Sequence, residues 1–190
     1  VSERKAAELA LRETNRQLHA RIEEIGRLQV ALQELAVRDP LTGLYNRRFA
    51  APQLVAIAAR ARAEGTPFAV MVMDLDRFKQ VNDLYGHAAG DQVLIEVARR
   101  LTANLRDSDV LARIGGEEFL AILPGSCMVN ARRVAERLCQ VMDEDPFRLV
   151  SGETLHVTVS IGVAVAGAGG EASFALEGLV EQADLALLES

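Results

Sequence analysis

The chain has 190 residues, of which 49% are hydrophobic, so it can build one domain of ordinary size with an appendage. Its formal net charge of −6 argues against a nucleic-acid-binding protein, because such proteins gain affinity mainly from Lys and Arg on phosphates. Cys127 and Cys139 are expected on one helix, too far apart to bridge, so no disulfide framework is predicted.

No apolar stretch approaches the roughly 20 residues of a membrane helix, and no signal peptide is visible. We therefore expect these residues to be cytoplasmic and to make no membrane contact. The sequence begins without Met and in the middle of a predicted helix, so we expect a fragment of a longer protein.

Residues 1–37 are predicted to form one long helix, because they contain no Pro, a single Gly and many good helix formers. Residues with the a and d spacing of a coiled coil recur along it: Leu11, Leu18, Ile25 and Leu32 at one position, and Asn15, Ile22, Gln29 and Ala36 at the other. From Ile25 to Leu28 the repeat changes phase, which starts a second seam. A parallel dimer is the favoured interpretation, and a helix packed onto its own domain is the alternative.

Residues 38–190 are predicted to form one α+β domain, separated from the helix by Pro40, which disfavours helical geometry at Asp39. Hydrophobic periodicity and turn signals predict these elements: helix 44–63, strand 68–74, short helix 78–84, long helix from 90, hairpin 110–123, helix 129–141, strand 156–165 and helix 174–188. This β-α-β-β-α-β order with additions predicts a ferredoxin-like split βαβ mixed sheet with flanking helices on one side.

The tip of the predicted hairpin carries Gly115 and Gly116, followed by Glu117 and Glu118. Adjacent glycines indicate a tight turn, since only Gly takes positive φ without steric cost. Two consecutive carboxylates beside bare backbone suggest a nucleotide and metal site, whereas a solvated hairpin is the alternative.

A second carboxylate cluster follows the wholly apolar run at 68–73, which is typical of a strand buried on both faces. Asp74 and Asp76 come directly after it, and strand alternation places them on one face. If this strand lies beside 119–123, Asp74 and Glu117 would converge on one hard cation. The alternative is a pair of solvated loop aspartates.

Five segments together resemble the GGDEF family of diguanylate cyclases, in order and spacing, across roughly residues 36–190. They are DPLTGLYNRR (39–48), MDLDRFKQVND (73–83), GHAAGD (86–91), GGEEF (115–119) and VSIGV (159–163). The resemblance implies a nucleotide-cyclase or polymerase-palm-like fold. It also implies condensation of two GTP into cyclic di-GMP and pyrophosphate, in a homodimer with one GTP per domain.

The resemblance also implies roles for individual residues. The metal ligands for Mg²⁺ or Mn²⁺ would be Asp74, the Leu75 carbonyl and Glu117, with Asp76 and Glu118 as neighbouring carboxylates. Glu118 would aid hydroxyl activation, and Lys79 would reach a terminal phosphate together with the backbone N–H groups at 77–79. The substrate-binding residues would be Asn82 and Asp91, which read guanine, with Phe78, Asp83, Gly115 and Gly116. His87 is interpreted as a structural residue between two glycine turns.

Arg106 and Asp109 resemble the family's inhibitory product site for cyclic di-GMP, with a solvated turn as the alternative. After residues 183–187 the family continues with Tyr, Lys and Gly-Arg-Asn, whereas here Leu188 replaces the Tyr and the sequence stops at Ser190. An upstream sensor domain is the partner that the predicted coiled-coil stalk implies. Two rival interpretations remain open: a receptor that holds GTP or cyclic di-GMP without turnover, and a coiled-coil signalling adaptor.

Overall fold

The computed structural model describes residues 15–25, 27 and 36–166. It divides into two compact units, Val1–Val37 and Arg38–Ser190, and each is considered by itself. In the first unit, residues 15–25 are helical as predicted. Leu18, Ile22 and Ile25, which belong to the predicted seam, are 54%, 59% and 54% exposed. The coiled coil stays a prediction, and its residues 11, 28, 29, 32 and 35 lie outside the described part of the chain.

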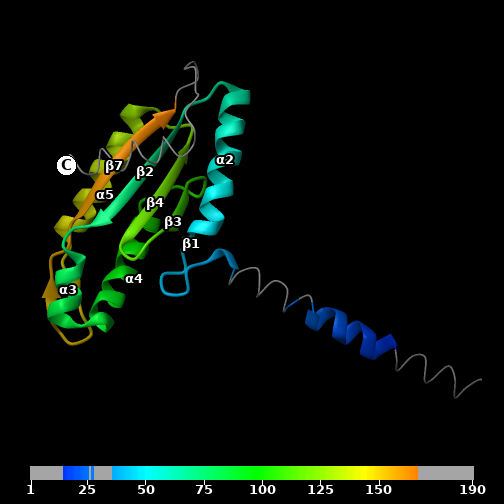
Figure 1. Ribbon diagram of the computed structural model, residues 1–190, viewed down its shortest axis with the longest axis horizontal. Helices are drawn as coiled ribbons and strands as arrows, with labels where there is room; N and C mark the ends of the chain where they lie inside the picture. The colour runs from blue at the N-terminus through cyan, green and yellow to red at the C-terminus, as the bar shows by residue number, and fades with distance from the viewer. Residues whose placement is uncertain (1–14, 26, 28–35, 167–190) are drawn as a thin grey trace, which may run out of the picture. The chain divides into compact units, whose positions relative to one another are not determined.

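The second unit is built on a five-stranded mixed sheet with the strand order β1-β3-β4-β2-β7 (Figure 1). The strands are β1 (Tyr45–Asn46), β2 (Phe68–Leu75), β3 (Val110–Arg113), β4 (Glu118–Pro124) and β7 (Val159–Ala166). The pairs β3–β4, β4–β2 and β2–β7 are antiparallel, and β1 pairs with β3 in parallel. The order β3-β4-β2-β7 is that of a split βαβ unit, so the predicted fold class is confirmed.

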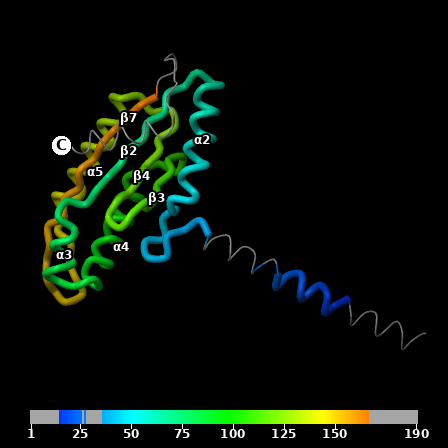
Figure 2. The backbone as a smooth tube through the Cα atoms, viewed as in Figure 1, coloured from blue at the N-terminus to red at the C-terminus, as the bar shows by residue number. Residues whose placement is uncertain are grey.

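Between residues 38 and 166 the unit also contains four helices: α2 (Arg47–Glu64), α3 (Phe78–Tyr85), α4 (His87–Ala103) and α5 (Met128–Glu144). A small second sheet pairs β5 (Phe147–Arg148) with β6 (Thr154–Leu155). Figure 2 shows the path of the chain from β2 through α3 and α4 into the β3–β4 hairpin. The predicted helix 174–188 lies outside the described residues.

The expectation that helices cover only one side of the sheet is wrong. Alternate residues of β2 enter two different hydrophobic clusters: Ala69, Met71 and Met73 pack in the cluster that includes α4 and α5, while Phe68, Val70 and Val72 pack in the cluster that includes α2. Helices on both faces explain why β2 is apolar at every position before Asp74.

The start of α2 also differs from the prediction of a helix beginning at residue 44. Tyr45 and Asn46 pair with Ala112 and Arg113 as β1, and the Asn46 side chain then accepts a hydrogen bond of 3.1 Å from the N–H of Phe49 as the helix cap. The two-residue strand is too short to produce a hydrophobic period, so the sequence pattern did not predict it. In the part of the chain that the structure describes, no helix is long and apolar enough to cross a membrane.

Candidate active site

The carboxyl end of β2 brings the predicted acidic residues together. Asp74 is half-buried and lies directly opposite Glu118 of β4 on one side and Ser160 of β7 on the other. Burial, followed by the charges of Glu117, Glu118 and Asp76, raises the pKa of Asp74 to about 6. The predicted neighbourhood of Asp74 and Glu117 is therefore present, and its negative charges repel one another.

This donor set fits a hard divalent cation. Carboxylate and carbonyl oxygens are the ligands that Mg²⁺ prefers, and a cation would relieve the repulsion that raises the pKa of Asp74. Within residues 15–25, 27 and 36–166, no three His, Cys, Asp or Glu side chains are already gathered closely enough to hold a metal. The ligand roles of Asp74, Leu75 and Glu117 stay predictions.

The hairpin tip, at residues 114–117 between β3 and β4, does not use its glycines as predicted. Neither Gly115 nor Gly116 has a positive φ. A Cβ atom on Gly115 would instead lie 2.0 Å from the Glu118 Oε2 atom, so this glycine makes room for the carboxylate, while Gly116 has open space around it. The connection spans four residues, which removes the need for the left-handed backbone of a two-residue turn.

Arg113, just before this tip, binds the hairpin from one side. Its Nη2 and Nε atoms donate hydrogen bonds of 2.7 and 3.1 Å to the carbonyl oxygen of Gly116. Its Nη1 atom lies 3.1 Å from Oδ1 of Asp39 in an ion pair that is mostly buried. The sequence analysis missed this pair because its members are 74 positions apart and share no local pattern.

Asn82, one of the two predicted guanine-reading residues, lies where α3 and α4 approach each other closely. A Cβ atom on Gly90 would lie 2.0 Å from Oδ1 of Asn82 and 3.1 Å from Cζ of Phe78. Because Gly90 has no side chain, the amide of Asn82 packs directly against it. The next residue, Asp91, has an exposed side chain. Phe78 is only 5% exposed and belongs to the core, so it supports this contact from inside.

The remaining predicted substrate residues lie on the surface of the same region. Lys79 and Asp83 are both exposed on α3. Arg77, before α3, has φ 56° and ψ 25°, and is the one non-glycine residue with positive φ in the described chain. This left-handed residue connects β2 to the first turn of α3, where the Gln80 N–H donates to the Arg77 carbonyl at 2.8 Å. The N–H groups of Phe78 and Lys79, which open the helix, have no carbonyl partner within it.

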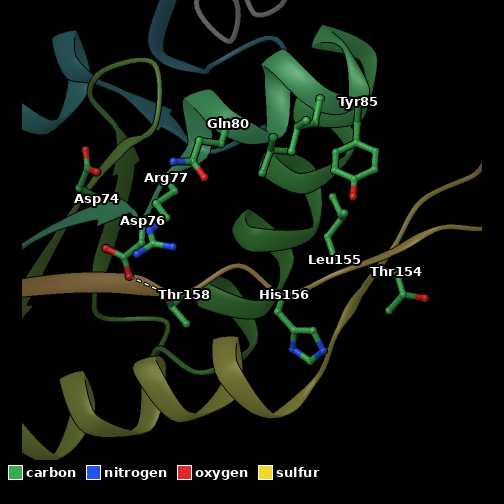
Figure 3. Close-up of a pocket in the computed structure, with 11 residues that line it drawn as sticks. Asp74, Asp76, Arg77, Gln80, Tyr85, Thr154, Leu155, His156 and Thr158 are labelled. Atoms are coloured by element: carbon green, nitrogen blue, oxygen red, sulfur yellow. Dashed lines mark hydrogen bonds between the residues drawn. The ribbon is translucent and has the colours of Figure 1, made fainter.

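A groove with a volume of about 790 Å³ lies between α3 and residues 154–158 (Figure 3). Its walls are α3 residues, including Gln80 and Tyr85, and the extended segment 154–158, and Asp74 and Asp76 also line it. The predicted guanine-reading residues Asn82 and Asp91 do not line this groove. Sequence analysis did not foresee it, because segment 154–158 reaches α3 only through the tertiary fold.

Asp76 is not a free carboxylate beside Asp74. Its Oδ2 accepts a hydrogen bond of 2.5 Å from Thr158 Oγ1, and its Oδ1 accepts one of 2.7 Å from Ser160 Oγ. His87 is exposed at the start of α4 after Gly86, which has φ 82°, whereas Gly90 is helical rather than part of a second turn. The predicted pair of glycine turns around His87 is thus correct on one side only.

Arg106 and Asp109 form a turn directly before β3. The Arg106 N–H donates to Oδ2 of Asp109 at 2.9 Å, and the Asp109 N–H donates to the Arg106 carbonyl at 2.9 Å. The Arg106 side chain is exposed. The structure therefore brings the two residues together and leaves the guanidinium accessible to solvent, and their role as a product site stays a prediction.

Comparisons with known proteins show which family the chain resembles. The family model described as "Diguanylate cyclase, GGDEF domain" matches residues 36–190. The response regulator PleD of Caulobacter vibrioides is 43% identical over 80% of this chain and 33% of its own length. The diguanylate cyclase DgcP of Pseudomonas aeruginosa is 41% identical over 82% of this chain and 22% of its own length. The chain thus spans about a third or less of these two relatives.

A solved structure resembles the chain over more of its length. The crystal structure of the coiled coil and GGDEF domain of DgcB from Caulobacter crescentus in complex with c-di-GMP covers 92% of this chain and 92% of its own, at 31% identity and a TM-score of 0.81. The TM-score of this structure agrees with the α+β fold described above. The chain belongs to the GGDEF family of diguanylate cyclase domains.

Proposed function

We propose that this domain condenses two GTP molecules into one cyclic di-GMP with release of two pyrophosphates, in a homodimer that brings one GTP from each domain. The observation that carries this proposal is the cluster of Asp74, Glu117 and Glu118 at the ends of β2 and β4, where burial and mutual repulsion raise the pKa of Asp74 to about 6. An arrangement of this kind is unfavourable without a positively charged ligand.

In the proposed reaction, the 3′-hydroxyl oxygen of each GTP attacks the α-phosphate of the other. A P–O bond forms at each α-phosphate, the bond to the β-phosphate oxygen breaks, and each hydroxyl gives up its proton. Asp74, the Leu75 carbonyl and Glu117 would hold Mg²⁺ or Mn²⁺, which neutralises phosphate charge and acidifies the hydroxyl. Glu118, which is exposed on the hairpin beside Gly115, would accept the hydroxyl proton.

Substrate binding is assigned to α3 and α4. Asp91 would accept hydrogen bonds from N1 and N2 of guanine, and adenine, which lacks both donors, would leave that carboxylate unpaired. Asn82, whose side chain packs closely against Gly90, would complete the fork. Lys79 and the N–H groups that open α3 would bind the phosphates. Asp83, Gly115 and Gly116 would line the remainder of the nucleotide site.

Control is assigned to two further parts of the chain. The exposed guanidinium of Arg106 and the carboxylate of Asp109 would bind cyclic di-GMP as an inhibitory product. The stalk at residues 1–37 would join two domains as a coiled coil and link them to an upstream sensor, with the fragment in the cytoplasm. The structure of the coiled coil and GGDEF domain of DgcB in complex with c-di-GMP supports both assignments.

One assay tests the proposed activity. The protein is incubated with GTP, with and without Mg²⁺, and cyclic di-GMP and pyrophosphate are measured by chromatography. We expect both products with Mg²⁺, in a ratio of one to two, and neither without it. Glu117→Gln should abolish turnover in a folded protein, because a neutral amide is a poor ligand for Mg²⁺. Glu64→Gln, at the far end of α2, is the matched control and should retain full activity.

The rival interpretations give different results. A receptor domain would bind GTP or cyclic di-GMP without releasing pyrophosphate. A coiled-coil adaptor would neither bind nor convert nucleotide, and its carboxylates would be replaceable without effect. Near-normal turnover in a folded Glu117→Gln protein would contradict the assignment of this residue to the metal.

A further inference from the structure

Two hydroxyl residues that the proposed function does not use lie at the start of β7: Thr158 directly before the strand and Ser160 within it. Thr158 and Ser160 are two positions apart, so strand alternation places both on the same face, while Val159 between them is buried. Both hydroxyls donate to the carboxylate of Asp76, one to each oxygen. The Asp76 N–H also donates to the Thr158 carbonyl at 3.0 Å. Three hydrogen bonds therefore fasten one residue to this segment, as Figure 3 shows for Thr158.

Asp76 lies at the turn that leads from β2 into α3. Leu75, whose carbonyl is a predicted metal ligand, precedes it, and the left-handed Arg77 follows it. A left-handed conformation is unfavourable for a residue with a Cβ atom and persists where the surroundings hold it in place. No side-chain hydrogen bond caps α3 at Arg77. The three hydrogen bonds of Asp76 with Thr158 and Ser160 thus hold this turn against the sheet.

We propose that Asp76 is a positioning residue, held by Thr158 and Ser160, which locks the β2–α3 turn so that the Leu75 carbonyl and the first N–H groups of α3 are correctly placed for catalysis. The proposal rests on the proposed cyclase function. In this proposal Asp76 binds the hydroxyls of Thr158 and Ser160 rather than the metal, because both of its carboxylate oxygens already accept hydrogen bonds from them. The proposal also gives a purpose to the hydroxyl residues at 158 and 160.

The proposal predicts that removal of the hydroxyl groups has the same effect as removal of the charge. Thr158→Val and Ser160→Ala take away one donor each and leave every carboxylate of the site in place. Asp76→Asn removes the charge and replaces one acceptor oxygen with a donor group, so one of the two hydroxyls can no longer donate to this side chain. Each variant should lower kcat for GTP conversion about tenfold, the factor expected for one hydrogen bond to a charged group.

Two controls accompany these variants. Thr158→Ser keeps the hydroxyl and should retain most of the activity. Thr154→Val makes the same chemical change at an exposed threonine of the same groove that makes no hydrogen bond to Asp76, and it should match the wild type. The double variant Asp76→Asn with Thr158→Val should lose less activity than the two single effects multiplied together, because both substitutions act on one shared hydrogen-bond network.

A second measurement does not depend on turnover. Amide hydrogen exchange reports the opening of the turn through the N–H groups of Asp76 and Gln80, which are bonded to the Thr158 and Arg77 carbonyls. In Thr158→Val we expect these two amides to exchange about tenfold faster, with the amides of Val70 and Val72 in β2 unchanged. Ser160→Ala gives the same test with a smaller change if Thr158→Val does not fold.

The outcomes separate this proposal from the proposed function. If Asp76→Asn is inactive while both hydroxyl variants are fully active and exchange normally, Asp76 acts directly on metal or substrate and the proposal is overturned. If the wild type does not convert GTP but the turn opens in Thr158→Val, the cyclase assignment fails and the locking of the turn stands. Unchanged exchange in both hydroxyl variants shows that the contacts do not hold the turn.

Discussion

The guanidinium of Arg113 and the carboxylate of Asp39 form an ion pair, 3.1 Å apart, with side chains only 14% and 18% exposed. The same guanidinium donates two hydrogen bonds to the Gly116 carbonyl. Asp39 also accepts from the N–H and hydroxyl of Thr42, at 2.8 and 2.6 Å. The Arg113 side chain thus joins the turn at the start of the second unit to the tip of the hairpin that carries Glu117.

Replacing Arg113 with Lys should therefore weaken both the fold and the activity. An ammonium group has no planar fork and cannot bind Asp39 and Gly116 together. We expect Arg113→Lys to lower the free energy of unfolding by about 1–2 kcal/mol and to reduce kcat, as measured by urea denaturation and GTP conversion. Arg60→Lys is the control, because its pair with Glu64 is exposed. Equal effects of the two substitutions on stability and kcat would contradict the inference that Arg113 couples Asp39 to the hairpin tip.

The pair also has a predictable dependence on pH. Burial opposes ionisation of Asp39, but the hydrogen bonds from Thr42 and the Arg113 guanidinium outweigh it and hold the pKa of Asp39 below its usual value. Since the folded pKa is the lower one, the stabilisation is present above the unfolded pKa of about 3.9 and is lost as pH falls through the folded pKa. The stability difference between wild type and Asp39→Asn should be constant from neutral pH down to about 5 and shrink below about 4.

Neutralising Asp74 should stabilise the metal-free protein at high pH. Burial and the charges of Glu117, Glu118 and Asp76 raise the pKa of Asp74 to about 6, so its ionisation opposes folding above that pH. At pH 8 without Mg²⁺ we expect Asp74→Asn to be more stable by about 1 kcal/mol, after allowance for solvent screening. The gain should fall as pH drops through 6 and vanish below about 4, by thermal unfolding.

The same experiment in the presence of Mg²⁺ checks the cause. The wild type should gain stability with Mg²⁺ and lose that gain below about pH 6, where protons compete for Asp74, and Asp74→Asn should gain little. Asp143→Asn, at an exposed position of α5, changes the net charge equally and should show neither effect. A stabilisation of similar size in Asp143→Asn would mean that net charge, and not the carboxylate cluster, is responsible.

Arg106→Ala should relieve inhibition by cyclic di-GMP. The Arg106 side chain is exposed and its backbone N–H, not its guanidinium, bonds Asp109, so the substitution removes the cation and keeps the turn. We expect the concentration of cyclic di-GMP that halves the initial rate to rise at least tenfold, with kcat at low product unchanged. Arg132→Ala, an exposed arginine on α5, is the control. Unaltered inhibition would leave residues 106–109 as an ordinary turn.

The stalk should be required for activity at low protein concentration. Leu18, Ile22 and Ile25 are exposed on the helix at residues 15–25, and a tether would replace a bimolecular encounter with an effective concentration on the order of millimolar. We expect replacement of all three by Asp to give a folded monomer that binds GTP and makes almost no cyclic di-GMP at low micromolar protein. Sedimentation and product formation are measured together.

The matched control for the stalk places three Asp residues on the outer face of the same helix, at His19, Ala20 and Glu23. This control should remain a dimer and stay active, because its substitutions avoid the a and d positions. A seam variant that sediments as a monomer with full activity would contradict the need for a dimer. A seam variant that stays a dimer would show that the wrong residues were assigned to the seam.

The sequence by itself determined the fold class and the position of the acidic cluster. The apolar run of β2 has no polar position before Asp74, so it requires cover on both faces. The order of helices and strands then requires a split βαβ sheet, which the strand order β3-β4-β2-β7 confirms. Hydrophobic periodicity and composition are local properties of the sequence. They suffice to predict an element when it is long and its buried residues follow one regular pattern.

Only the tertiary structure decided the contacts between segments far apart in the chain. Asp39 meets Arg113 across 74 positions, and Asp76 meets Thr158 across 82. It also showed that α2 covers the second face of the sheet and that Gly115 serves to admit Glu118 rather than to take a positive φ. Such contacts depend on how the elements pack, and a polar pair formed on packing leaves no periodic trace in the sequence because each partner alone resembles an ordinary solvated side chain.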